Sequence, residues 1–319
     1  MMEPIKGLHH VTAVARDPQR NVDFYRNVLG QRLVKRTVNF DSPDTYHFYF
    51  ADETGTPGSV LTFFAWPSMK RGVHGNGETN AVAYNVPTGS FGFWQEHLKQ
   101  NGITPDAIEK RFDQDVLSFS DPDGMRVELI ASASKPIAQF WEEGPIPEEY
   151  ALSGFHSVTL WLDEVKPTAD LLINQMGYQA TGQEGSRHRF IGDANTMGNI
   201  VDIVHRPGKM QAGFGAGSIH HIAFRVPNDE KQLGYRSLLS EAGFQVTPVM
   251  DRSYFHSIYF RERGDVLFEI ATDTPGFLID EPADSLGEAL KLPEWLEKNR
   301  KQIEQSIAPL TLNAIEKVK

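Results

Sequence analysis

The chain contains no cysteine, no long apolar run and no excess of positive charge. Without cysteine, the protein has no disulfide, thiolate nucleophile or Cys-ligated zinc. No apolar stretch reaches the ~18 residues of a membrane-spanning helix, and the first six residues lack the apolar core of a secretory signal. Lys and Arg number 31 against 42 Asp and Glu, a formal charge of −11 without a basic cluster for phosphate binding. We therefore expect a soluble cytoplasmic protein with a small-molecule ligand and no nucleic-acid or membrane partner.

The sequence repeats one pattern four times. Each repeat opens with a short run rich in Val, Ile, Phe and Thr, residue types that favour strands. The four runs are residues 8–15, 81–87, 155–162 and 219–226. Each run precedes an amphipathic stretch that ends at a glycine, as helices often do. These glycines are Gly30, Gly102, Gly177 and Gly243.

More strand-like runs follow each glycine. In the first repeat they are residues 32–40, 46–51 and 60–66, and the later repeats close with 126–131, 200–205 and 266–271. The pattern predicts a βαβββ module repeated four times over about residues 7–272. In the first module, Asp17 and Pro18 predict the start of a helix that continues to Leu29.

A single βαβββ module leaves one face of its sheet uncovered, so the modules must pair. We expect an α+β fold in which four modules pair into two curled mixed sheets, with a C-terminal helical tail. Proline and acidic residues at 135–153 indicate a linker. The expected divisions are an N-terminal domain (1–140), a C-terminal domain (150–275) and a tail (276–319). In the tail, residues 290–307 are predicted to form a helix packed outside the sheets.

Histidines and carboxylates recur at matching points of these modules. Counting back from each helix-ending glycine to about the same point of the first strand gives His10, Ala81, His156 and His221. The middle of each last strand gives Thr62, Glu128, Asp202 and Glu269. A carboxylate in an apolar strand is costly unless it is paired, hydrogen-bonded or bound to a metal. The recurrence of both residue types favours a metal site over isolated core residues.

Two ways of pairing the modules predict two sets of metal ligands. If the third module pairs with the fourth, the set is His156, His221 and Glu269. If the first pairs with the fourth, the set is His10, His221 and Glu269. Doubled histidines at 9–10 and 220–221 favour the second set, and one histidine of each pair should face the metal, because adjacent strand residues face opposite ways. Two histidines and one carboxylate form the facial triad that suits Fe(II) and O2 chemistry.

The remaining histidines lack this positional support. They are His47, His74, His97, His188, His205 and His256. His97 falls on a predicted helix, where we expect a solvated side chain.

Four segments in this order resemble the hydroquinone ring-cleaving dioxygenases of the vicinal-oxygen-chelate (glyoxalase/extradiol dioxygenase) superfamily. They are residues 7–12, 46–58, 185–190 and 219–224. The resemblance covers nearly the whole chain, tail included. It implies Fe(II), or Mn(II) as in close relatives, held by His10, His221 and Glu269. It also implies that both atoms of O2 enter an aromatic diol whose ring is opened.

The resemblance further implies catalytic roles for five residues near the ligands. They are Thr12, His9, His220, Arg252 and Tyr259. The tyrosine would hydrogen-bond a substrate oxygen or move a proton. The arginine would stabilise negative charge on oxygen, and the two histidines would orient the ligands.

Other functions remain open for this sequence. A glyoxalase- or epimerase-type lyase or isomerase would often need a fourth ligand, which Thr62 does not offer. A drug-binding protein of the same fold would need no three-ligand site. The loops at 69–76 and 208–217 differ from the hydroquinone enzymes and are expected to line the pocket. The expected partners are a small aromatic substrate and O2, and a homodimer is compatible with the chain.

Overall fold

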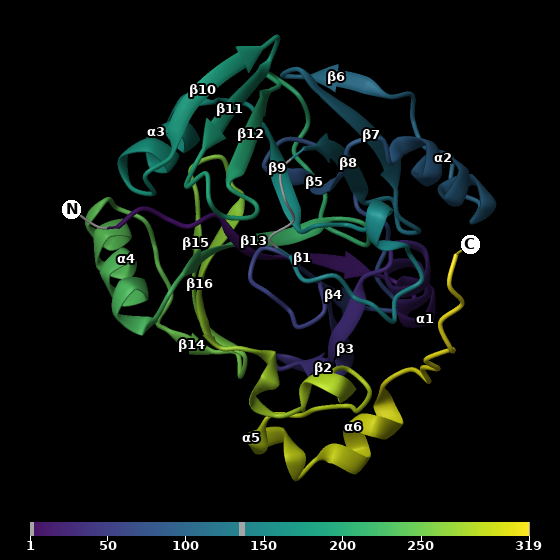
Figure 1. Cartoon of the computed structure of the whole chain (residues 1–319). Helices are drawn as coiled ribbons and strands as arrows, with labels where there is room; N and C mark the ends of the chain where they lie inside the picture. Colours follow the sequence, from purple (N-terminus) through teal and green to yellow (C-terminus); the bar gives the residue numbers. More distant parts are fainter. Residues whose placement is uncertain (1–2, 134–137, 319) are drawn as a thin grey trace.

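Within the residues that the structure describes, sixteen strands form two curled mixed sheets of eight strands each (Figure 1). The computed structural model describes residues 3–133 and 138–318, so Lys135 and Pro136 of the expected linker lie outside the described part. In spatial order, the first sheet contains β14 (Met250–Asp251), β15 (Phe255–Arg261), β16 (Leu267–Pro275), β13 (Ile219–Val226), β1 (Leu8–Ala15), β4 (Val60–Ala65), β3 (Ser42–Ala51) and β2 (Arg32–Asn39). The second sheet contains β10 (Gln179–Glu184), β11 (Arg187–Ile191), β12 (Ile200–His205), β9 (Phe155–Leu162), β5 (Glu78–Pro87), β8 (Arg126–Ser132), β7 (Gln114–Ser120) and β6 (Glu109–Arg111).

Each sheet joins two modules through one antiparallel strand pair. β1 pairs with β13, so the first module lies beside the fourth. β5 pairs with β9, so the second lies beside the third. Within a module, the first and last strands run parallel, as β1 and β4 do. The predicted α+β fold of four βαβββ modules is confirmed, as is the pairing of the first module with the fourth. The domain division at residues 140–150 remains a prediction.

The central strands are buried on both faces. All eight residues of β1 are buried, which explains why its sequence lacks a polar-apolar alternation. One face of each sheet looks inward, and the other carries the module helices at the outside of the molecule (Figure 1). The module helices are α1 (Pro18–Val22), α2 (Phe91–Gln100), α3 (Lys166–Asn174) and α4 (Asp229–Glu241).

The four predicted helix-ending glycines all have positive φ, between 71° and 83°. An L-residue with a side chain would be strained there. The first helix differs from the prediction in one respect, because α1 continues as a π-helical turn at Asp23–Val28. Its start is as expected, with the Asp17 side chain accepting a hydrogen bond from the Arg20 amide.

The tail packs along the outside of the first sheet, below β2 and β3 in Figure 1. Its predicted single helix is wrong: two short helices form, α5 (Glu294–Glu297) and α6 (Arg300–Ser306). The helix breaks because Asn299 has a non-helical ψ of 8°. The buried amine of Lys35 on β2 donates to Asp280 and Glu281 of the tail, which ties the tail to the sheet.

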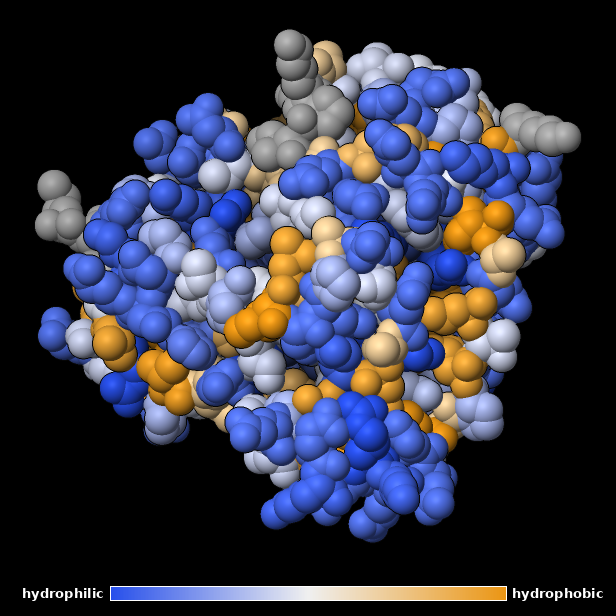
Figure 2. Space-filling view, turned by 60° about the horizontal axis from the view of Figure 1, so that its bottom comes forward, coloured by the Kyte–Doolittle hydropathy of each residue, from blue (hydrophilic) through white to orange (hydrophobic). Residues whose placement is uncertain are grey.

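The face toward the tail is mostly hydrophilic, with apolar residues in small separate groups (Figure 2). Scattered surface apolar residues of this kind are ordinary in folded proteins. No helix among residues 3–133 and 138–318 has the length and apolar character to cross a membrane.

Candidate metal centre

Three predicted ligands converge at the seam between the first and fourth modules. His10 lies on β1, His221 on β13 and Glu269 on β16, and all three are at most 5% exposed. The Nε2 atoms of the histidines are 3.3 Å apart, and Glu269 Oε2 lies 3.3 Å from His10 Nε2 and 2.9 Å from His221 Nε2. Three ligand atoms on one face of an ion with bonds of about 2.0–2.2 Å would lie about 3 Å apart. The spacing therefore fits one cation.

The carboxylate has one oxygen without a hydrogen-bond donor. Glu269 Oε1 accepts a hydrogen bond from the Ser257 hydroxyl. Glu269 Oε2 is buried and receives no hydrogen bond of good geometry from the described residues. Burial alone would raise the pKa of Glu269, but His10 and His221 hold that pKa well below its usual value. A buried, ionised and unsatisfied oxygen beside two imidazole nitrogens is what a metal cation would satisfy.

The other histidine of each doubled pair lies beside a predicted ligand. His9 Nδ1 lies 2.9 Å from His10 Nδ1, and His220 Nδ1 lies 2.7 Å from His221 Nδ1. Burial lowers the pKa of both supporting rings, in His220 to about 3, so they are neutral near pH 7. A neutral supporting ring can accept the Nδ1 hydrogen of the ligand histidine. That hydrogen bond leaves the ligand Nε2 with its lone pair free for a cation.

The open side of the triad faces a cavity of about 230 Å³. An engineered cavity of about 150 Å³ can hold benzene, so a single substituted ring fits this space. The apolar walls are formed by Phe40, Phe64, Trp66, Phe255 and Leu267. The polar residues that line the cavity include Thr12, His220, Arg252 and Tyr259, four of the predicted catalytic residues. The fifth, His9, is buried behind His10.

Arg252 and Tyr259 form a pair at the cavity wall. Arg252 Nε donates to the Tyr259 hydroxyl oxygen at 3.2 Å, and its Nη1 lies 3.3 Å from Asp41. Burial, followed by the charge of Glu269, raises the pKa of Tyr259, so the phenol stays protonated. Burial opposes the charge of Arg252, but Tyr259 and Asp41 raise its pKa. The pair offers a fixed positive charge and a phenol O–H group to a ligand in the cavity.

His47 on β3 is a cavity residue that the sequence analysis missed. Its Nε2 lies 2.9 Å from Thr62 Oγ1, and its Nδ1 lies 3.0 Å from the Tyr49 hydroxyl. The Thr62 hydroxyl in turn lies 2.8 Å from that of Thr12. The available signal was the alternation along the strand, which places His47 and Tyr49 on the same face.

The second sheet has no equivalent triad. The strand pairing aligns Ala81 with His10 and Ser157 with His221, so the predicted equivalence of His156 with the ligands is wrong by one residue. His156 instead matches His9 and His220, and its Nδ1 lies 3.0 Å from Ser157 Oγ. Among the described residues, His10, His221 and Glu269 are the only group of three His, Asp or Glu side chains placed to share an ion.

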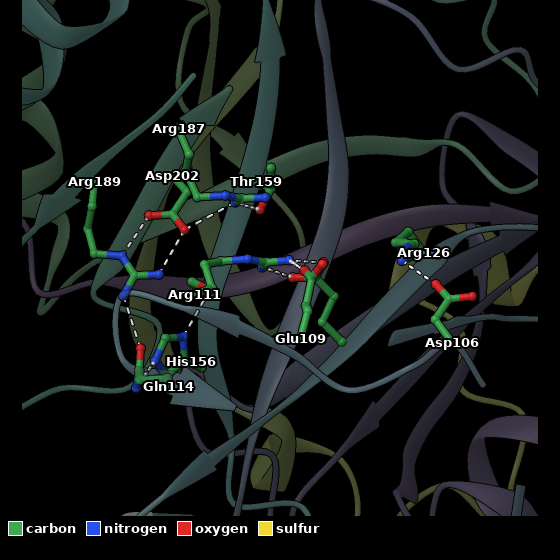
Figure 3. Close-up of polar contacts among 12 residues, drawn as sticks. Asp106, Glu109, Arg111, Gln114, Arg126, His156, Thr159, Arg187, Arg189 and Asp202 are labelled. Carbon is green, nitrogen blue, oxygen red and sulfur yellow. Dashed lines mark hydrogen bonds and ion pairs between the residues drawn. The ribbon is translucent and has the colours of Figure 1, made fainter. Parts of the chain in front are cut away.

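Arginines neutralise the buried carboxylates of the second sheet (Figure 3). Arg111 donates to both oxygens of Glu128, at 2.6 and 3.0 Å. Arg189 donates to both oxygens of Asp202, at 2.8 and 2.9 Å, and Arg187 reaches Asp202 at 3.2 Å. The two carboxylates are therefore satisfied by the chain itself.

Two further expectations need correction. The loops at 69–76 and 208–217 do not line the cavity beside the triad; they pair with each other, for example through Val73 and Gly213. The backbones of the two loops lie so close together that a side chain on Gly75 or Gly215 would collide with the opposite loop, which explains the glycines at these positions. His97 is buried rather than solvated, and its Nε2 donates to the Val28 carbonyl at 2.8 Å.

The chain is similar to known proteins along its whole length. The Glyoxalase/Bleomycin resistance protein/Dioxygenase superfamily matches residues 7–129. MhqO of Bacillus subtilis, named as a candidate ring-cleaving dioxygenase, is 43% identical over 99% of this chain and 100% of its own. The chlorohydroquinone/hydroquinone 1,2-dioxygenase of Sphingobium indicum is 35% identical over 92% of this chain and 94% of its own.

Solved structures agree with the fold. A crystal structure from Bacillus subtilis, described as a candidate dioxygenase, has a TM-score of 0.92 at 42% identity and covers 98% of this chain and 100% of its own. Glyoxalase I from Zea mays shares the fold at 12% identity, with a TM-score of 0.63 over 84% of this chain and 92% of its own. The chain therefore belongs to the ring-cleaving dioxygenase family of the glyoxalase/bleomycin resistance protein/dioxygenase superfamily.

Proposed function

We propose that this protein is a metal-dependent dioxygenase that opens the ring of a hydroquinone or a related aromatic diol with O2. One observation carries the proposal. Two imidazole nitrogens and an unsatisfied carboxylate oxygen, from His10, His221 and Glu269, meet at the wall of an aromatic-lined cavity. The relatives named as ring-cleaving dioxygenases support the same reaction class.

The proposed metal is Fe(II), with Mn(II) as the alternative. Two histidines and one carboxylate leave several positions open, which suits an ion that must accept substrate and dioxygen together. When bound, the metal would supply those positions and the redox capacity of the reaction. The residues fit such an ion, because among the described residues the buried Oε2 of Glu269 receives no hydrogen bond of good geometry, and the supporting histidines leave both Nε2 atoms available.

The other cavity residues would hold the substrate. The apolar walls favour an aromatic ring over a sugar or peptide. Arg252 would stabilise the oxygen of a deprotonated hydroxyl, and the protonated Tyr259 would donate a hydrogen bond or a proton to an oxygen beside it. Both oxygen atoms of O2 would enter the product as a ring bond beside a hydroxyl-bearing carbon breaks.

The test is anaerobic loading of the purified protein with Fe(II) or, separately, Mn(II), followed by oxygen uptake with hydroquinone, chlorohydroquinone and catechol. We expect one O2 consumed for each diol and no uptake by metal-free protein. A loaded protein that consumes no oxygen with any diol would refute the proposal. Conversion of a substrate without oxygen would instead favour a glyoxalase-type lyase or isomerase. A cytoplasmic location and a homodimer remain predictions from the sequence.

A further inference from the structure

A chain of four hydrogen-bonded side chains runs across the first sheet at the wall of the cavity, which Tyr49, His47 and Thr12 line. Tyr49, His47, Thr62 and Thr12 are linked in that order, with separations of 3.0, 2.9 and 2.8 Å. The chain crosses three adjacent strands, β3, β4 and β1. None of its members belongs to the proposed ligand triad, and Thr12 stands two residues beyond His10 on the same strand face.

All donors in this chain point toward Thr12 when His47 carries its hydrogen on Nε2. Burial raises the pKa of Tyr49 well above its usual value, so its hydroxyl stays protonated and, with this tautomer of His47, donates to His47 Nδ1. A neutral histidine with an accepting Nδ1 carries its hydrogen on Nε2, and that hydrogen faces Thr62 Oγ1. The Thr62 hydroxyl then donates to Thr12 Oγ1. One lone pair of Thr12 Oγ1 therefore accepts the hydrogen bond from Thr62.

The hydrogen of the Thr12 hydroxyl remains to be donated. Among the described residues, no acceptor for it is found, although Thr12 is only 1% exposed. The residue lines the cavity, and its Cα lies opposite that of His221 across the β1–β13 pair. An oxygen of a ligand bound beside the triad would satisfy this hydroxyl, which is otherwise buried without an acceptor.

The identity of residue 62 fits this arrangement. The equivalent residues of the other modules are the carboxylates Glu128, Asp202 and Glu269. An ionised carboxylate only accepts hydrogen bonds, so it could not donate to Thr12. A threonine accepts a hydrogen bond from His47 and donates one to Thr12. The Thr12 hydroxyl then has its own hydrogen free to donate into the cavity.

We propose that Tyr49, His47 and Thr62 are positioning residues that fix the Thr12 hydroxyl as a donor to an oxygen of the bound aromatic substrate. The site would thus favour a ring that presents an acceptor oxygen at this point, such as the monoanion of a hydroquinone. The inference rests on the proposed function for the identity of the substrate. It assigns these residues to substrate binding and leaves retention of the metal to the triad.

The test measures anaerobic binding of hydroquinone to the Mn(II)-loaded protein by calorimetry. Thr62→Val removes the hydroxyl and keeps the shape, and we expect about tenfold weaker binding with an unchanged metal content. Thr62→Ser should restore binding to about the wild-type value. Thr159→Val, which removes a buried strand threonine hydroxyl from the second sheet, is the matched control and should leave binding unchanged.

A double-mutant cycle separates a role through Thr12 from a local packing effect. If Thr62 acts through Thr12, the double variant Thr12→Val/Thr62→Val should bind about as weakly as Thr12→Val alone. Additive losses, unchanged binding by Thr62→Val, or loss of metal from that variant would each overturn the inference while the proposed function stands. A loaded wild-type protein that binds none of hydroquinone, chlorohydroquinone and catechol would overturn both.

Discussion

The two sheets of this protein hold their buried carboxylates in opposite ways. Both are built from two βαβββ modules with the same strand order, and both place acidic residues in the middle of apolar strands. In the second sheet, Glu128 and Asp202 are neutralised by arginines of the same chain. In the first sheet, Glu269 lies beside the imidazole rings of His10 and His221, and its Oε2 receives no hydrogen bond of good geometry from the described residues. The difference makes Glu269, rather than a carboxylate of the second sheet, the candidate to bind a cation from outside the chain.

The strand positions show how the difference arises. Arg189 lies opposite Asp202 on the neighbouring strand, just as Tyr259 lies opposite Glu269. An arginine at the first position fills the space beside the carboxylate with a guanidinium. A tyrosine at the second position contributes no charge, so no guanidinium from the strand beside it neutralises Glu269. The residue opposite the carboxylate is thus one difference between the ion pair of Asp202 and the candidate metal site at Glu269.

The largest effect is expected from removing a proposed metal ligand. His221→Ala takes away one of three donor atoms, and we expect its affinity for Fe(II) to fall by about 10,000-fold or more, which is roughly 5.6 kcal/mol. Oxygen uptake with hydroquinone should be lost with the metal. Metal analysis after dialysis against a weak chelator measures the loss.

The matched control for this variant is His156→Ala in the second sheet. His156 is also a buried strand histidine, but its neighbours are Ser157 and Gln114 rather than a free carboxylate. We expect it to keep the wild-type metal content. Equal metal loss from both variants would remove the distinction between the two sheets.

A smaller effect is expected from breaking an ion pair in the second sheet. Arg111→Met leaves Glu128 buried with its bidentate partner gone. Breaking such a pair typically costs about 3–5 kcal/mol, because one charge remains uncompensated. Denaturant unfolding should show this loss in the free energy of unfolding. The activity of the folded fraction should be unchanged, because the proposed site lies in the other sheet.

The double variant Arg111→Met/Glu128→Leu tests the reason for that loss. With both charges removed, the uncompensated carboxylate is gone, and we expect most of the lost stability to return. A double variant as unstable as Arg111→Met would show that packing around the arginine side chain, rather than the charge of Glu128, is responsible.

The module repeat and the convergence of His10, His221 and Glu269 were predictable from the sequence for physical reasons. The strands are short apolar runs that end at turn residues, and such local patterns can be recognised in the sequence alone. The ligands His10 and His221 stood out because their doubled neighbours occur in just two modules. Glu269 stood out because an acidic residue between Phe268 and Ile270 needs a partner.

The missed features depend on distances that the sequence does not contain. The register of His156 was wrong because the spacing between strand and glycine varies among modules: Ser157 stands 20 residues before Gly177, and His221 stands 22 residues before Gly243. His47 was missed because its partner Thr62 lies on a neighbouring strand, and Thr62 had been considered only as an absent ligand. The arginine partner of Asp202 likewise comes from the neighbouring strand β11, and that of Glu128 comes from β6, two strands away.

The smallest effect is the response of the second sheet to acid through His156. Burial, followed by the charge of Arg189, lowers the pKa of His156 to about 3, whereas a histidine in an unfolded chain has a pKa of about 6.5. Below about pH 6.5, the His156 ring is protonated in the unfolded chain but stays neutral in the folded chain. The free energy of unfolding therefore falls as the pH is lowered from about 6.5 to about 3. At pH 5 the loss from this residue is about 2 kcal/mol. His156→Gln should remove that share from the pH dependence of the unfolding free energy without changing the metal content. The exposed His205 supplies the control, and an equal change in His205→Gln would contradict the assignment to the buried ring.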